Sequence, residues 1–376
     1  MTVRIVSTMQ QLRALEPEWS RLLALSPSRD VFLTHSWFDL WFEHFGDSCE
    51  MFVLVWEPAG KVSAIAPFVI STERRRRIAA RILHFPLRES AGPLRCDMLL
   101  GSSPGAAMDA LVTFLQQQRK RWDLAELNGI PLGGQTAKLL ESSAQRVGWD
   151  VKLNGVAPSA LYLPVEMRWE AYVSARSQHL RRRLNQERSR LNRCGQWAFR
   201  HVDVVHDLAA GLDSVRTILL KRYHVAATNM LPPEDQRILR FLERLCERFA
   251  RAEMLDIRLL EIENQPAACL ISLVDEQKVY PFLTKYDPAF EMASPGRAVI
   301  SSLCAAALDC GYREIDFLSE RDYLYRFTDN KREFVNLVLR HRGWRSRLNQ
   351  VLERAALLRK TAAPVAKARG EIEETT

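Results

Sequence analysis

The sequence SPGRA at residues 294–298 decides the expected fold, because a near copy, SPGAA, stands at residues 103–107. Each copy opens a stretch with helical spacing of its apolar residues. Each stretch is followed by a short apolar run that carries an acidic residue, at 122–127 in the first half and at 312–318 in the second. Self-similarity of this kind indicates that one structural unit occurs twice in the chain.

The elements upstream of the two copies follow the same order. Before the first copy, apolar residues recur at helical spacing in 12–23 and 37–45, and a hairpin is expected over 51–70. Before the second copy, two helical stripes fall within 208–249 and three strands within 255–285. The sequence therefore predicts an α+β fold with two mixed β-sheets, each flanked by helices.

Length and composition set the expected lobes. The chain has 376 residues, 47% of them hydrophobic and 26% charged, and a chain of this length rarely forms a single core. We predict an N-terminal lobe at 1–160 and a C-terminal lobe at 165–343, separated by a linker near 154–164 where glycine and proline interrupt any pattern. A basic amphipathic helix and a disordered tail are predicted for 344–376.

Composition also argues against several classes of protein. No apolar run approaches the roughly 20 residues that span a bilayer, and the N-terminus lacks the pattern of a signal peptide. The seven cysteines are odd in number and never form a C-x-x-C pair, and the eight histidines include no H-E-x-x-H. We predict a cytoplasmic protein with free thiols and no metal site.

The second copy of the repeat has the features of an anion-binding helix start. Ser294 suits the N-cap and Pro295 suits the first helical position. Gly296 lets a ligand approach the backbone, where the helix dipole favours an anion. We predict a pyrophosphate cradle made by Ser294, Gly296, Arg297 and Ala298, with an ordinary helix start as the alternative.

Five runs follow one another in the second half of the chain: KVY at 278–280, YDPAF at 286–290, SPG at 294–296, GYREIDFL at 311–318 and YRF at 325–327. With shorter motifs in the first half, the pattern covers most of residues 10–340. It resembles the CelD-like group of GNAT acyltransferases, which is linked with cellulose and exopolysaccharide synthesis and is related to the FemAB-type aminoacyl transferases. The resemblance implies a tandem duplicated GNAT-like fold with a degenerate N-terminal lobe.

The resemblance also implies an activity. The protein would be an N- or O-acyltransferase that moves an acyl group from acyl-CoA, acetyl-CoA first among them, to an amine or hydroxyl of an envelope-polysaccharide or amino-sugar precursor. Transfer would be direct, without a covalent enzyme intermediate. The cradle departs from the usual pattern at one position, since Ala293 stands where an Arg or Gln is typical.

Five further residues are given roles by this reasoning. Asp316 is the predicted base, because it ends a strand beside the expected cofactor cleft, and Tyr325 is the predicted donor to the leaving thiolate. Lys285, Tyr286 and Arg326 are predicted to bind the acceptor. The alternative for each is structural: a cap or ion pair for Asp316, a packed ring or a solvated charge for the others.

Seven arginines surround three leucines between residues 176 and 193, which predicts a helix with one narrow apolar stripe and a cationic remainder. Two other functions therefore stay open. A FemAB-like transferase would hold charged tRNA on this segment, and a non-catalytic scaffold of a polysaccharide synthesis complex is favoured by Ala293. An anionic membrane surface is a further expected partner of this helix and of 344–358, which would place the protein peripherally at the inner face of the membrane.

Overall fold

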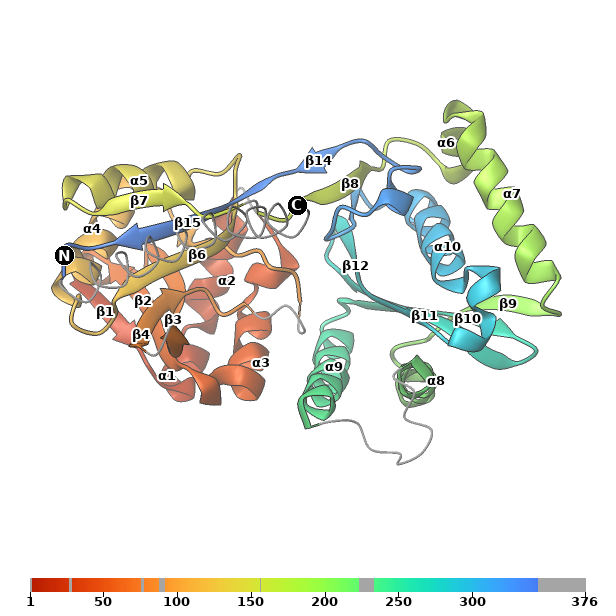
Figure 1. The fold of residues 1–376 in the computed structure, drawn as a ribbon, viewed down its shortest axis with the longest axis horizontal. Coiled ribbons are helices and arrows are strands. Elements are labelled where there is room, and N and C mark those ends of the chain that lie inside the picture. Colours follow the sequence, from red (N-terminus) through yellow and green to blue (C-terminus); the bar gives the residue numbers. More distant parts are fainter. Residues whose placement is uncertain are drawn as a thin grey trace, which may run out of the picture.

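The computed structural model describes residues 2–26, 29–75, 78–87, 92–155, 157–222 and 233–343. These residues form two lobes side by side, each built on a mixed β-sheet that carries helices (Figure 1). The predicted α+β class with two flanked mixed sheets is confirmed. The helix and tail predicted for 344–376 lie outside the described residues.

The first half of the chain confirms the predicted order of helices and hairpin. The hairpin turns where Ala59 and Gly60 both take positive φ, of 52° and 77°. The elements are β1 (Thr2–Val6), α1 (Met9–Ala14), α2 (Glu16–Leu25), η1 (Val31–Leu33), α3 (His35–Phe45), η2 (Gly46–Ser48), β2 (Glu50–Glu57), η3 (Pro58–Gly60), β3 (Ala64–Arg75), β4 (Ile78–His84), β5 (Leu99–Leu100), α4 (Pro104–Gln117), β6 (Leu124–Pro131), α5 (Thr136–Arg146) and β7 (Asp150–Leu153).

The second half confirms the two predicted helical stripes, the three-stranded meander and the helix that begins at the SPG repeat. The elements are β8 (Ala160–Pro164), α6 (Trp169–Ala175), α7 (Gln178–Asn192), β9 (Trp197–His201), α8 (Leu208–Arg222), α9 (Pro233–Arg251), β10 (Leu255–Ile262), β11 (Gln265–Val274), β12 (Lys278–Tyr286), η4 (Pro288–Ala293), α10 (Pro295–Asp309), β13 (Glu314–Asp316), η5 (Asp322–Leu324), β14 (Lys331–Arg332) and β15 (Phe334–Arg340).

The two sheets have the same strand order, which supports a duplication. The N-terminal sheet runs β1-β2-β3-β4-β6-β15-β7, with β5 paired to β3, and the C-terminal sheet runs β9-β10-β11-β12-β13-β8-β14. In each sheet an antiparallel series meets the next strand in parallel, at β4–β6 and at β12–β13. The SPG helix, α4 or α10, enters each unit just before that next strand.

The lobes exchange one strand. Strand β15, from the far end of the described chain, lies between β6 and β7 in the N-terminal sheet. Strand β8, which follows β7 along the chain, lies between β13 and β14 in the C-terminal sheet. The irregular linker expected over 154–164 is therefore wrong for 160–164, because these residues form β8, which Pro158 precedes and Pro164 ends.

A continuous apolar core crosses from one lobe to the other. The ring of Trp37 on α3 contacts Phe241 of α9, with centroids 5.8 Å apart, and Phe282 of β12 at 6.0 Å. At the edge of this contact, Arg248 of α9 is 2.6 Å from Asp39 of α3. The lobes are thus held together by apolar packing and by an ion pair. A cavity between them is therefore lined by residues with fixed positions.

Candidate active site

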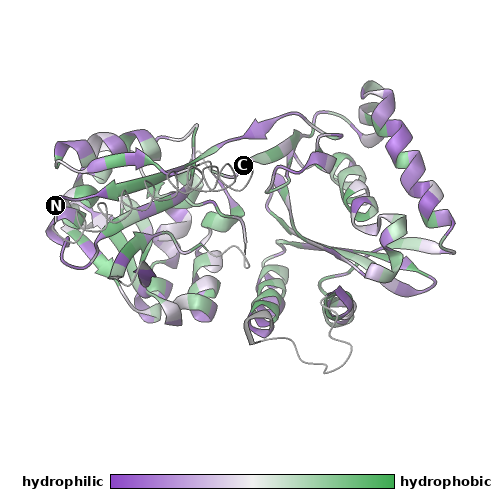
Figure 2. Cartoon of the chain, in the orientation of Figure 1, coloured by the Kyte–Doolittle hydropathy of each residue, from purple (hydrophilic) through white to green (hydrophobic). Residues whose placement is uncertain are grey.

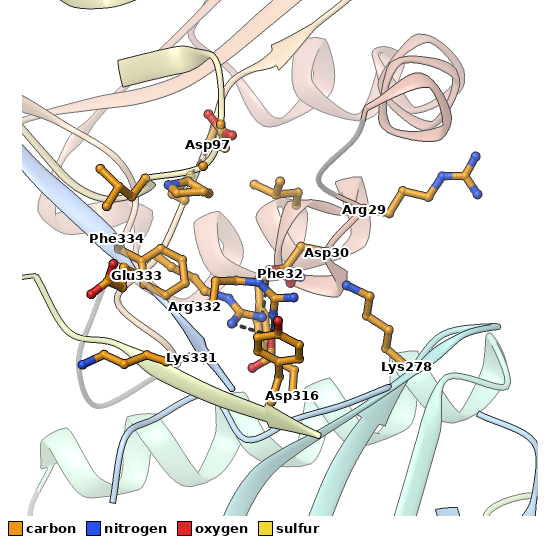
Figure 3. Close-up of a pocket in the computed structure, with 18 of the residues that line it drawn as sticks. Arg29, Asp30, Phe32, Asp97, Lys278, Asp316, Lys331, Arg332, Glu333 and Phe334 are labelled. Carbon is orange, nitrogen blue, oxygen red and sulfur yellow. Dashed lines mark hydrogen bonds and ion pairs between the residues drawn. The ribbon is translucent and has the colours of Figure 1, made fainter. Parts of the chain in front are cut away.

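A cavity of about 760 Å³ lies between the two lobes (Figure 3). The N-terminal lobe contributes residues 95–97 and the loop 131–135 between β6 and α5, and the C-terminal lobe contributes Lys278 and Asp316 from its sheet. In Figure 3, Asp97 and Asp316 lie at opposite ends of the labelled group. Both lobes therefore supply ionisable groups to one cavity.

A buried ion network forms the wall of this cavity. Arg95 is 6% exposed and reaches Asp316 Oδ2 at 2.9 Å with Nη1 and Asp30 Oδ2 at 2.8 Å with Nη2. Burial alone would lower the pKa of Arg95, but the two carboxylates outweigh it and raise that pKa. Because Asp30 precedes η1 in the N-terminal lobe and Asp316 ends β13, the network joins the lobes.

The predicted base, Asp316, lies at the end of β13 as expected, and all of its polar contacts are internal. Its Oδ2 accepts from Arg95 and, at 2.5 Å, from Arg332, while its Oδ1 accepts the Leu318 N–H at 2.9 Å. To take a proton, Asp316 would have to give up part of this arrangement. Its role as base stays a prediction.

The segment that follows β4 provides the residues that the sequence did not single out. It runs beside β6 beyond the end of β4, and the Cys96 N–H donates to the Gly129 carbonyl at 3.2 Å. Gly129 has φ of 73°, and a Cβ at that position would lie 2.0 Å from the Leu94 carbonyl oxygen. In the N-terminal lobe this segment therefore fills the place beside β6 and presents Arg95 and Asp97 to the cavity.

Asp97 differs from Asp30 and Asp316, the two carboxylates of the ion network, in lacking a cation. It is 6% exposed, and its Oδ1 accepts the Met98 N–H at 2.8 Å. No Lys or Arg of the described residues forms an ion pair with it. Burial raises the pKa of Asp97 to about 6, against hydrogen bonds from Thr136 and the Met98 amide. The sequence carries no distinctive signal here, since burial and the missing partner appear only in three dimensions.

The C-terminal sheet splits next to the cavity. Strands β12 and β13 pair in parallel only through Lys278 with Glu314 and Val279 with Ile315. Beyond that point β12 continues to Tyr286 with no strand of the described residues on this side, and Phe282 forms a bulge against β11. Bulges of this kind free backbone groups and occur next to active sites.

The predicted cradle residues lie together at the start of α10, near the open part of this split. A Cβ on Gly296 would lie 3.3 Å from Tyr286 Cδ1, so the bare backbone stands beside β12. Ser294 takes a left-handed conformation, with φ of 54°, and its side chain does not cap the helix as predicted. Its Oγ instead accepts from Arg190 Nη1 at 3.0 Å.

The residues present fit a phosphate group at this cradle. Ala293 is buried and offers no cation, which agrees with the departure seen in the sequence. Arg190 of α7 brings a guanidinium to the same helix start from another element. The cradle thus combines an open backbone at Gly296 with a cation beside Ser294, the combination that anion sites at helix N-termini use.

The other predicted residues do not line the cavity between the lobes. Tyr325 is partly exposed and donates to Glu320. Arg326 is buried, pairs with Glu187 of α7 and donates to Ser301 Oγ at 3.1 Å. Lys285 and Tyr286 lie on the open part of β12. In the described part of the chain, no three metal-binding side chains cluster, and no helix has the length and apolarity needed to cross a membrane.

Residues 178–326 match the family model described as an acetyltransferase (GNAT) domain. The match begins at α7 and includes the meander, α10 and β13. No curated protein sequence matches the chain.

Solved structures share the whole two-lobed arrangement. FemX has a TM-score of 0.61 at 9% sequence identity, covering 94% of this chain and all of FemX. A conserved protein of unknown function from Bacteroides thetaiotaomicron has a TM-score of 0.53 at 9% identity, covering 90% of this chain and 99% of that protein. A tandem GNAT protein from the clavulanic acid biosynthesis pathway has a TM-score of 0.48 at 9% identity, covering 90% and 98%. The domain match and the duplicated sheet, with the first two of these structures, confirm the predicted tandem GNAT-like fold.

Proposed function

We propose that this protein, with a GNAT acetyltransferase domain at 178–326, transfers an acyl group from acyl-CoA to an amine or hydroxyl of a substrate held between the lobes. One observation carries the proposal: the open split between β12 and β13 lies beside the cradle of α10, and the residues at its closed end, Lys278 and Asp316, line the cavity. A donor on one side and an acceptor on the other would meet at this split.

The donor side follows from the cradle. GNAT domains generally use acyl-CoA, whose thioester supplies the acyl group when it is bound. Ser294, Gly296, Arg297 and Ala298 would hold the diphosphate together with Arg190, and acetyl-CoA is the first candidate. Within this proposal Tyr325 would have to release Glu320 before it could donate to the leaving thiolate, its predicted role.

The acceptor side follows from Asp97. An amine or hydroxyl must lose a proton as it attacks, and a carboxylate with a pKa of about 6 is ionised at neutral pH yet more basic than an ordinary Asp. We assign proton acceptance to Asp97 in place of the predicted Asp316, because the contacts of Asp316 with Arg95 and Arg332 suit a positioning role for it and for Arg95. Aromatic rings beside charged groups, including Phe32 and Phe334, suit a precursor sugar with polar and apolar faces. Envelope-polysaccharide and amino-sugar precursors are the acceptor class that we propose.

Charged tRNA is the second candidate donor. The observation in its favour is that Arg190 links the arginine-rich α7 to the cradle. A tRNA is a longer polyanion than a compact nucleotide, so it would contact more of the arginines of α7. The non-catalytic scaffold suggested by Ala293 is the remaining alternative, and it predicts no turnover with either donor.

The test is acceptor-dependent release of thiol from acetyl-CoA and longer acyl-CoAs, with a panel of amino sugars and their nucleotide-linked forms. We expect Asp97→Asn to slow release by about a hundredfold or more. Asp123→Asn is a matched control, because Asp123 is also buried in the N-terminal lobe but lies outside the cavity. Transfer from charged tRNA but from no acyl-CoA would show that tRNA is the donor and overturn the acyl-CoA assignment. No transfer from either donor would overturn the proposal as a whole.

A further inference from the structure

Helix α7 carries a cationic face that nothing in the described structure neutralises. Leu180 and Leu191 are buried on the side that packs toward α10. Glu187, the only acid on the helix, is buried on the same side and pairs with Arg326. The remaining surface of α7 is therefore free of acidic side chains, and Figure 2 shows the helix as a long hydrophilic element at the outer edge of the C-terminal lobe.

Six arginines belong to α7 and its C-cap, and none of them forms an ion pair with an acid in the described part of the chain. By contrast, Arg200 on β9, the next strand along the chain, contacts the carboxylate of Glu261. An unpaired row of this size is costly in self-repulsion and is typical of a surface that meets an external polyanion. The six are Arg181, Arg182, Arg183, Arg188, Arg190 and Arg193.

Large apolar side chains are exposed on segments that adjoin α7 or its neighbour α6. Met292, in η4, which packs against α7, is 87% exposed. Phe199, on β9 directly after α7, is 39% exposed, and Met167, just before α6, is 40% exposed. Such side chains on otherwise polar surroundings suit insertion into the interfacial layer of a bilayer.

We propose that the arginine face of α7, with the apolar tips of Met292, Phe199 and Met167, docks the protein on an anionic membrane surface. Basic residues near such a surface each contribute attraction, and the apolar tips add burial that salt does not screen. A nucleic acid is disfavoured because Met292, the most exposed apolar side chain of this surface, offers no ring on which a base would stack. The proposal goes beyond the transfer reaction and does not depend on it.

The test is flotation of the full chain with vesicles of phosphatidylcholine alone or with about one third phosphatidylglycerol. We expect binding only to the anionic vesicles. The triple variant Arg182→Gln, Arg188→Gln, Arg193→Gln should bind about a hundredfold more weakly. Arg190 is left unchanged because it contacts Ser294 at the cradle.

The matched control is Arg119→Gln, Arg216→Gln, Arg240→Gln, which removes the same charge from exposed positions on other helices or their ends. It should bind vesicles like the parent protein, and Met292→Ser should weaken the part of binding that survives high salt. Equal loss in both triple variants, or no binding to anionic vesicles, would overturn the proposal. Binding of tRNA in place of vesicles, lost in the first triple variant only, would assign the face to a nucleic acid and overturn it as well.

Discussion

Arg95 and Asp97 stand two residues apart in one segment and have opposite surroundings. Arg95 bridges carboxylates from both lobes, whereas Asp97 is buried with backbone and hydroxyl partners and no cation. The first arrangement stabilises a charge, and the second makes a charge costly. One short segment beside β6 thus supplies both the joint between the lobes and the group that titrates near neutral pH.

The pH dependence of turnover tests the role of Asp97. Because the ionised carboxylate is the base, kcat/KM should rise with pH and level off above an apparent pKa of about 6. Asp97→Asn should lose this limb along with most of the activity. The measurement is thiol release at acceptor concentrations well below KM from pH 5 to 9, and an unchanged limb in the variant would assign the titration to another group.

The same residue predicts a pH-dependent stability. The native pKa of Asp97, about 6, lies above its ordinary value of 3.8, so the native state binds this proton more tightly than the unfolded chain. The contribution of Asp97 to stability therefore falls as pH rises from about 4 to 6, and it stays low above that. Asp97→Asn should stabilise the protein at pH 8 by about 3 kcal/mol and by much less at pH 4. Urea unfolding at both values measures the difference.

Removal of Arg95 tests the buried joint. Arg95→Met would leave Asp30 and Asp316 buried without their shared partner, and breaking such a pair costs about 3–5 kcal/mol of unfolding free energy. Arg121→Met is the control, because Arg121 forms a half-exposed pair with Glu50, and such pairs contribute under about 1 kcal/mol. Equal losses of unfolding free energy in the two variants would show that Arg95 stabilises the protein no more than an exposed ion pair does.

At the scale of elements, the spacing of apolar residues predicts those helices and strands whose packing partners lie close along the chain. The helical stripes within α3, α8 and α9 and the β10–β12 meander are visible in sequence because each packs one face against a nearby partner. Strands β8 and β15 were missed, because their partners lie far along the chain: Val338 of β15 pairs with Glu126 of β6. The cradle was predicted from its residue types, whereas Asp97 required knowledge of burial and Arg190 required knowledge of which helix lies beside α10.

The exchanged strand β15 offers a test at this scale. Leu339 is buried, and its register partners are Ala125 on β6 and Val151 on β7, so Leu339→Ala should cost about 2–4 kcal/mol. Val335 is half-buried near the start of the same strand. Val335→Ala should therefore lower the free energy of unfolding by less than half as much as Leu339→Ala. Denaturant midpoints measure both, and equal small losses would mean that β15 adds little to the N-terminal sheet.

The whole molecule should unfold as one unit. Each sheet contains a strand from beyond the other lobe, and the apolar core runs through Trp37, Phe241 and Phe282. Neither lobe can open without exposing part of the other. Scanning calorimetry should therefore give one transition with equal calorimetric and van't Hoff enthalpies. Two resolved transitions would contradict this coupling.

The two similar units differ at the place where the strands of the sheet part. In the C-terminal lobe the strands part beside the start of α10, whereas in the N-terminal lobe the segment with Cys96 occupies the corresponding place beside β6. We infer that the first unit lost its donor cleft and became the wall of an acceptor cavity. The duplicated SPG repeat then offers a control inside the same chain, since Gly105 starts α4 as Gly296 starts α10.

Titration with acetyl-CoA, followed by thermal unfolding, tests the central claim most directly. A ligand at a hundred times its Kd stabilises the native state by about 2.7 kcal/mol. We predict a clear rise in Tm for the parent protein and for Gly105→Val, whose added side chain meets open space, and no rise for Gly296→Val beside Tyr286. Equal stabilisation of both glycine variants, or none of the parent protein, would contradict a donor site at the start of α10.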